Sequence, residues 1–156
     1  MKILVTLVCL LTAGASPLWA QKAGDFGAGV ILGDPTGATA KLWLDGSHAL
    51  DAGLGFDSDV LVYGDYLWHS LRVFPQPAEG KLPVYLGLGA QIGDSHHDNN
   101  FGLRAVAGVA YLFPRNPLEI FFELVPVIHF SHDDHYYHDN RTDLNAGLGL
   151  RYYFTW

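Results

Sequence analysis

Apolar and polar residues alternate along residues 143–156, which read DLNAGLGLRYYFTW. Every second residue from Leu144 to Trp156 is apolar or aromatic, and the residues between them are polar or small. A period of two residues is typical of a β-strand with one apolar face and one polar face. This stretch therefore predicts a strand whose two faces meet different environments.

Similar alternation recurs along the chain, interrupted by turn-forming residues such as those of Asp34–Gly37. The further strands are expected at residues 25–33, 38–45, 48–57, 60–70, 82–93, 101–113 and 118–130. Strands of about nine to twelve residues can cross a membrane when tilted. The pattern predicts an all-β fold, an eight-stranded antiparallel up-and-down transmembrane β-barrel.

Three connections between these strands are expected to be longer loops. Residues 72–83 hold Pro75, Pro77 and Pro83, which should prevent a hydrogen-bonded ladder, and residues 94–100 and 131–142 are polar. An even number of strands puts both termini on the periplasmic side. The proline-rich connection then falls on that side too, where short turns are the rule.

The polar phase of the strands carries charged and hydrogen-bonding residues. This predicted barrel-interior polar network comprises Lys41, Asp51, Asp65, His69, Arg104, Glu119, Glu123 and Arg151, and Tyr63, Tyr85 and Gln91 lie on the same face. Such groups would be costly in the apolar centre of a soluble sandwich unless paired. Inside a barrel they can pair with one another, and an eight-stranded barrel is just filled by side chains. We therefore expect a plugged, charged interior.

The first twenty residues have the features of a secretory signal peptide. Lys2 precedes a short apolar run that contains Cys9, the only cysteine, and the small Ala20 could precede a cleavage site. The run is too short to span a bilayer comfortably. We expect residues 1–20 to be a signal peptide and residues 21–156 to be one outer-membrane β-barrel domain, exported through the periplasm of a Gram-negative-type bacterium.

The amino-acid composition limits the kinds of partner that the protein is expected to bind. The chain is 49% hydrophobic and 16% charged, with a formal net charge of −7. An acidic chain without a basic stripe is not expected to bind nucleic acid. We predict outer-membrane lipid as the surroundings, no cofactor and a monomeric state. A soluble β-sandwich would have a similar composition, so composition alone does not decide the class. A soluble lipocalin-like carrier is a third possibility.

The final strand, with its closing Trp156, resembles the C-terminal strand of bacterial outer-membrane barrels. That resemblance implies recognition by the outer-membrane barrel assembly machinery. The stretches GAGVILGDPTGATAKLWL (27–44), YLGLGAQIG (85–93), and FFELVPV followed by NAGLGLRYYF resemble a family of small outer-membrane barrels related to the OmpA transmembrane barrel. The resemblance implies eight strands and no periplasmic domain. It supplies no established activity, so we expect a structural or surface-interaction role.

One alternative is catalytic. His129, Ser131 and Asp143 are similar to the His-x-Ser and downstream acid of the lipid A 3-O-deacylase family, with Asp where that family has Glu. A Ser activated by an acid-oriented His can perform acyl transfer. However, the strand phase of these residues also carries Glu119 and Arg151, which points it into the barrel. We therefore favour an interior role over catalysis.

A second alternative is metal binding at the outer loops. Histidines there lie beside aspartates, and imidazole and carboxylate suit Zn, Cu or Ni. The candidate ligands are His96, His97, His132, His135 and His138. Their spacing matches no firm metal-site motif, so metal binding is a compositional hypothesis.

Overall fold

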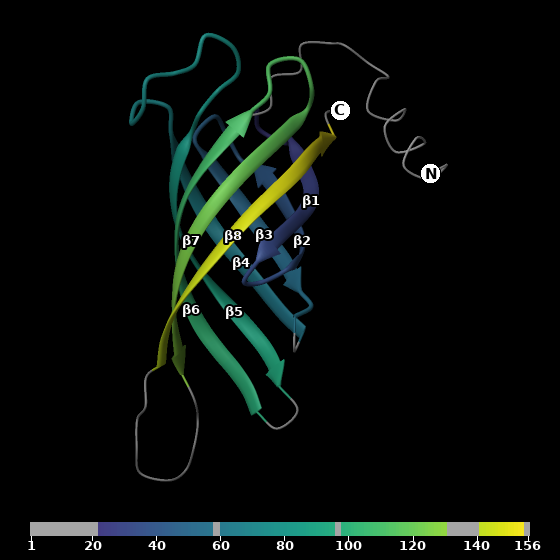
Figure 1. Cartoon of the computed structure of the whole chain (residues 1–156), viewed down its shortest axis with the longest axis vertical. Helices are drawn as coiled ribbons and strands as arrows, with labels where there is room; N and C mark the ends of the chain where they lie inside the picture. The colour runs from purple at the N-terminus through teal and green to yellow at the C-terminus, as the bar shows by residue number, and fades with distance from the viewer. Residues whose placement is uncertain (1–21, 58–59, 96–97, 131–140, 155–156) are drawn as a thin grey trace, which may run out of the picture.

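The computed structural model describes residues 22–57, 60–95, 98–130 and 141–154. Its elements are β1 (Phe26–Gly33), β2 (Gly37–Trp43), β3 (His48–Gly55), β4 (Val60–Ser70), β5 (Val84–Ser95), β6 (Asp98–Leu112), β7 (Leu118–Phe130) and β8 (Arg141–Phe154). Each strand pairs antiparallel with the next, and β1 pairs with β8 to close the barrel (Figure 1). The predicted eight-stranded antiparallel up-and-down barrel is confirmed.

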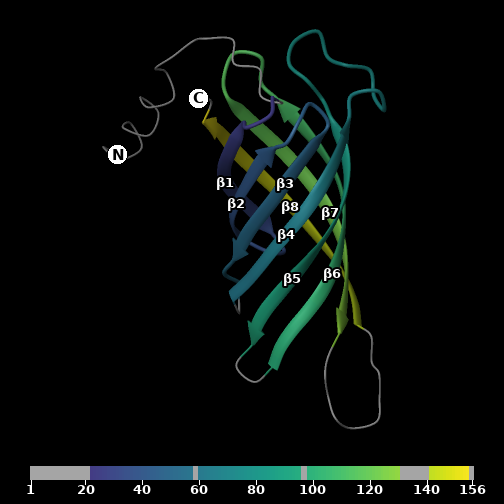
Figure 2. The same ribbon diagram turned by 180° about the vertical axis from the view of Figure 1, so that it is seen from behind.

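The barrel has one tall side and one short side. Strands β5 to β8 have 12 to 15 residues, whereas β1 to β3 have 7 or 8. In both views the longer strands extend well beyond the shorter ones at the end opposite the described termini (Figures 1 and 2). The rim at that end is therefore uneven.

The polar loops predicted at residues 94–100 and 131–142 include residues that belong to strands in the structure. The β5–β6 ladder continues to the pair Ser95 and Asp98, and β8 already begins at Arg141. Backbone groups make the ladder, so polar side chains do not end it when the strands project past the barrel wall. The switch to polar residues therefore indicates where the environment of the side chains changes, and not where the strands end.

The connection between β4 and β5 also differs from expectation at one point. Lys81 forms an isolated antiparallel bridge with Leu112, with N···O distances of 3.0 and 2.8 Å. Proline lacks the N–H that a ladder needs, but Lys81 lies between Pro77 and Pro83 and keeps its own donor. The prediction that no ladder could form here was therefore wrong at Lys81.

Asp45 organises the β2–β3 turn. Its carboxylate accepts hydrogen bonds from the backbone N–H groups of Ser47 (2.7 Å) and His48 (2.9 Å), and it lies 2.7 Å from Nδ1 of His48. These contacts, led by that of Ser47, lower the pKa of Asp45 below 3.8. A lowered pKa means that the turn is stabilised above pH 3.8, and that this contribution is lost as the pH falls through the lower, folded value.

Buried and exposed residues alternate along the strands, but the charged residues are buried and many large apolar residues are exposed, which is the reverse of a soluble domain. Outward residues are apolar, as Leu144 illustrates with 69% exposure, whereas Lys41, Glu119 and Arg151 on the inner face are 0% exposed. The predicted assignment of the two strand faces therefore agrees with the observed burial. Within the described ranges no helix has the length and hydropathy that crossing a membrane requires.

Closure of the barrel depends on close backbone approach between β1 and β8. A Cβ added at Gly29 would overlap the carbonyl oxygen of Leu150 and would lie only 2.7 Å from Cα of Arg151. Both are backbone atoms, so neither can move without disturbing the seam. In contrast, a Cβ at Gly64 would meet nothing closer than the carbonyl oxygen of Asp51, at 3.9 Å.

We predict that Gly29→Ala destabilises the barrel by about 1–3 kcal/mol, because overpacking at the seam forces the backbone to shift. Gly64→Ala, the matched control, should change the free energy of unfolding by less than about 0.5 kcal/mol. Urea unfolding in detergent micelles, followed by circular dichroism, measures both. Equal effects of the two substitutions would contradict the tight seam.

Candidate functional site

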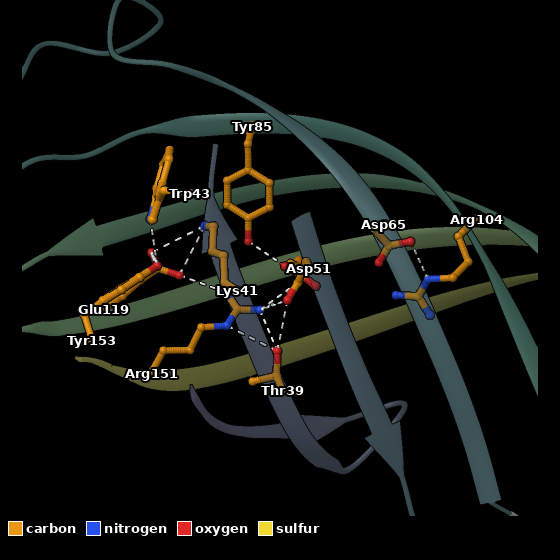
Figure 3. Close-up of polar contacts among 11 residues, drawn as sticks. Thr39, Lys41, Trp43, Asp51, Asp65, Tyr85, Arg104, Glu119, Arg151 and Tyr153 are labelled. Atoms are coloured by element: carbon orange, nitrogen blue, oxygen red, sulfur yellow. Dashed lines mark hydrogen bonds and ion pairs between the residues drawn. The ribbon is translucent and has the colours of Figure 1, made fainter. Parts of the chain in front are cut away.

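Arg151 on β8 is the centre of the ion-pair network inside the barrel (Figure 3). Its Nη2 lies 2.7 and 2.9 Å from the two carboxylate oxygens of Asp51 on β3, and its Nη1 lies 2.8 Å from Oε1 of Glu119 on β7. It also donates from Nη2 to Oγ1 of Thr39 on β2, at 2.7 Å. Four strands are thus joined through one guanidinium group, which is flat and rigid enough to serve several acceptors at once.

The carboxylate of Glu119 also contacts a second cation, Lys41, and the hydroxyl of Tyr153. Nζ of Lys41 lies 3.4 Å from each of its carboxylate oxygens, and Tyr153 donates its hydroxyl hydrogen to Oε2 at 2.8 Å. The indole Nε1 of Trp43 in turn donates to the Tyr153 hydroxyl at 3.1 Å. Lys41 also lies 4.8 Å from the centre of the Trp43 ring. The charge is therefore paired and surrounded by aromatic groups.

A second ion pair lies further from the termini. Arg104 donates from Nε to Oδ1 of Asp65 at 3.0 Å and from Nη1 to Oε1 of Gln91 at 2.9 Å. Its guanidinium carbon lies 4.1 Å from the centre of the Tyr63 ring. Arg104 and Arg151 bind different acceptors, so the described interior has two polar centres.

Glu123 and His69 complete the predicted set in different ways. Glu123 accepts a hydrogen bond from the Tyr85 hydroxyl at 2.7 Å. His69 lies between the rings of Trp43 and Tyr85, at centroid distances of 4.3 and 4.9 Å, and neither of its ring nitrogens has a hydrogen-bond partner among the described residues. His69 therefore belongs to the interior as an aromatic packing group rather than as a member of the hydrogen-bonded network.

Apolar side chains fill the space between the polar clusters. Ile31, Leu67, Phe121 and Val127 are buried on the inner face, and the Arg151 guanidinium carbon lies 3.7 Å from the centre of the Phe121 ring. The interior of the described barrel thus combines paired polar groups with apolar packing.

Aromatic side chains gather on the outer face near both ends of the barrel. The terminal-end aromatic band, near the described termini, consists of Phe26, Tyr66, Trp68, Tyr111, Phe113, Tyr152 and Phe154. Neighbours in it touch, as do Tyr66 and Trp68 with ring centroids 4.9 Å apart. Phe101 and Phe130, 6.2 Å apart, lie at the opposite end. Leucine, isoleucine, valine and alanine occupy much of the wall between.

Two of the catalytic candidates, His129 and Asp143, lie near the end of the barrel opposite the termini. Nε2 of His129 is 3.3 Å from Oδ2 of Asp143, and both lie on the inward strand phase, as expected. Asp143 is exposed and His129 is partly exposed at this rim. Ser131 lies outside the described residues, so the structure brings together only the acid and the histidine.

The metal-binding candidates His96, His97, His132, His135 and His138 all lie outside the described residues. Among the residues that are described, no group of three or more His, Cys, Asp or Glu side chains is arranged to hold a metal ion.

Three hydrogen-bonded members of the interior network were missing from the prediction. Thr39 accepts from Arg151, and Tyr153 bridges Trp43 to Glu119. All three lie on the inward phase of their strands, which is the signal that could have identified them. They were missed because the network had been selected mainly by charge.

The closed wall and the buried ion pairs define an up-and-down β-barrel with charged residues inside it. No protein-family model matches the chain, and no curated protein matches it. Among solved structures it is similar to the N-terminal β-barrel domain of Pseudomonas aeruginosa OprF, with 18% identity, a TM-score of 0.53, and coverage of 86% of this chain and 100% of that one. This likeness concerns the fold, and it agrees with the OmpA-type barrel that the sequence resemblance implied.

We predict that Arg151→Met destabilises the barrel by about 3–5 kcal/mol, because it leaves Asp51 and Glu119 buried without their shared cation. Arg115→Met is the control, since Arg115 forms only an exposed ion pair with Glu79. It should cost less than about 1 kcal/mol. Urea midpoints of the refolded barrel measure both, and equal midpoints for the two variants would rule out a central role for Arg151.

Proposed function

We propose that this chain is an integral outer-membrane β-barrel protein with a structural or surface-interaction role and no catalysis. The observation that carries the proposal is the inverted burial: charged residues such as Lys41 and Arg151 are fully buried, while leucines cover the outside. In water such a surface would be a large exposed apolar patch, which soluble monomers rarely carry. In a bilayer it is the surface that lipid requires.

Two further features support a membrane location. Closure between β1 and β8 leaves no open sheet edge, and lipid cannot hydrogen-bond the free N–H and C=O groups of an edge. The terminal-end aromatic band and the aromatic residues at the other end lie where the two membrane interfaces would be. By the rule for even-stranded barrels, the end with the termini faces the periplasm.

The same proposal implies two kinds of partner. Outer-membrane lipids would surround the wall, and the last strand would be recognised by the barrel assembly machinery. The alternation of β8 supports the second expectation, because its outward residues Leu144, Leu148 and Phe154 form an apolar row. We expect residues 1–20 to be removed as a signal peptide during export.

The pair formed by His129 and Asp143 favours a second candidate, a lipid A 3-O-deacylase-like hydrolase. An acid 3.3 Å from a histidine is the arrangement that orients a general base. The pair lies on the inward phase, however, away from the acyl chains that such an enzyme would attack. We therefore rank this function below the non-catalytic role.

We predict that Leu148→Arg destabilises the barrel in phospholipid bilayers by about 2–4 kcal/mol, because a cation near the bilayer midplane loses its hydration. Leu148 lies halfway along β8, paired with Phe122 and Leu32, and is exposed on the outside. Ser47→Arg, in the exposed β2–β3 turn, is the control and should change stability by less than about 0.5 kcal/mol. Urea titration in vesicles compares the two. A harmless arginine at position 148 would argue for a soluble barrel.

For the hydrolase we predict that cells producing the wild-type chain and cells producing Ser131→Ala contain identical lipid A. Mass spectrometry of extracted lipid A detects the loss of an acyl chain. Loss of the chain with the wild type but not with Ser131→Ala would overturn our preference. His129→Gln is the parallel variant, because it removes the proposed base without touching the serine.

A further inference from the structure

The connection between β4 and β5, residues 71–83, is held in a single shape by Gln76. The side-chain Nε2 of Gln76 donates to the carbonyl oxygens of Leu71 (2.9 Å), Phe74 (3.2 Å) and Leu82 (3.2 Å), and its Oε1 accepts from the backbone N–H of Leu82 at 2.9 Å. One amide thus satisfies backbone groups at both ends of the connection and at its middle. We call residues 71–83, whose backbone is bound at several points by this amide, the platform, and Gln76 its hub.

The platform rests on the outside of the barrel. The hydroxyl of Tyr111 donates to the carbonyl oxygen of Glu79 at 3.1 Å, and Lys81 bridges to Leu112. Tyr111 belongs to the terminal-end aromatic band and packs edge-on against Phe113, with ring centroids 4.9 Å apart. The connection therefore continues directly from the part of the wall proposed to meet the membrane interface. In both views it rises past the end of the barrel and swings sideways beyond the wall (Figures 1 and 2).

The platform presents two apolar side chains. Val73 and Phe74 are 57% and 48% exposed, next to the exposed Arg72. Pro75 follows directly and restricts the backbone at Phe74. An aromatic and an aliphatic side chain beside a cation suit the boundary between acyl chains and phosphate headgroups.

We propose that the β4–β5 connection lies on the membrane surface and inserts Val73 and Phe74 among the lipid headgroups, with Arg72 beside the phosphates. The proposal rests on the membrane location proposed above. Lipid is favoured over a protein partner because Tyr111, which fixes the platform, belongs to the outward aromatic band. The connection thereby anchors the barrel in the leaflet nearest the termini, which gives a function to a connection longer than a turn requires.

The test places an environment-sensitive fluorophore at single cysteines in the full chain. Cys9→Ser removes the native thiol, and Phe74→Cys, Leu148→Cys and Ser47→Cys supply one label each. The variants are refolded into phosphatidylethanolamine–phosphatidylglycerol vesicles, and folding is checked by circular dichroism. Quenching is measured with nitroxide-bearing lipids and with aqueous iodide. Ser47, exposed in the β2–β3 turn at the same end, is the reference for water.

We expect the label at position 74 to lose fluorescence with shallow nitroxide lipids and to resist iodide, as the label at 148 should with deep ones. If the label at 148 meets lipid while that at 74 behaves like that at 47, the anchor is refuted and the membrane barrel stands. The connection would then be open to a protein partner. If the label at 148 also meets water, the membrane location itself fails, and the anchor fails with it.

A second variant tests the role of the platform. Gln76→Ala removes the hub but leaves Val73 and Phe74 unchanged. Lipid quenching at position 74 should fall, while quenching at 148 stays the same. Unchanged quenching at position 74 would show that the apolar pair reaches lipid without a preformed platform, which would overturn the role assigned to Gln76.

Discussion

The ion pairs of Arg151 are the interaction on which the barrel depends. Its guanidinium bonds to groups on β2, β3 and β7 while belonging to β8, so it ties together strands that are far apart in the sequence. A buried ion is tolerated only when its partners are in place. Pairing fixes which strand face is inside, and the period of two residues then puts the leucines outside. The same register of the strands therefore produces both the apolar outer wall and the charged interior.

The faces of the strands were predictable because they depend only on alternation along each strand. Asp51 and Arg151 could be assigned to the interior from the sequence, but their contact could not. They are 100 residues apart, and their meeting depends on how the strands are staggered around the closed barrel. Thr39 was overlooked for a related reason, since its neutral hydroxyl joins the network only where the stagger of the strands brings Asp51 and Arg151 beside it.

The connections were harder to predict than the strands. The polar residues after Ile92 indicated a loop, yet the backbone continues its ladder to Ser95, because pairing does not require apolar side chains. In the proline-rich connection, one glutamine organises the backbone through contacts with three carbonyl groups. No sequence motif predicts that a glutamine will form these hydrogen bonds. The His129–Asp143 contact, in contrast, follows from the shared phase that the sequence already indicated.

The central claim is that the apolar outside of this barrel is covered by lipid. The most direct measurement is detergent phase partitioning of the full chain produced in a Gram-negative host, combined with fractionation of the membranes. The account predicts that the protein sediments with outer membranes, resists extraction by high salt and enters the detergent phase. Recovery of the folded barrel in the aqueous phase would contradict it, because exposed leucines and buried ion pairs would then need another explanation.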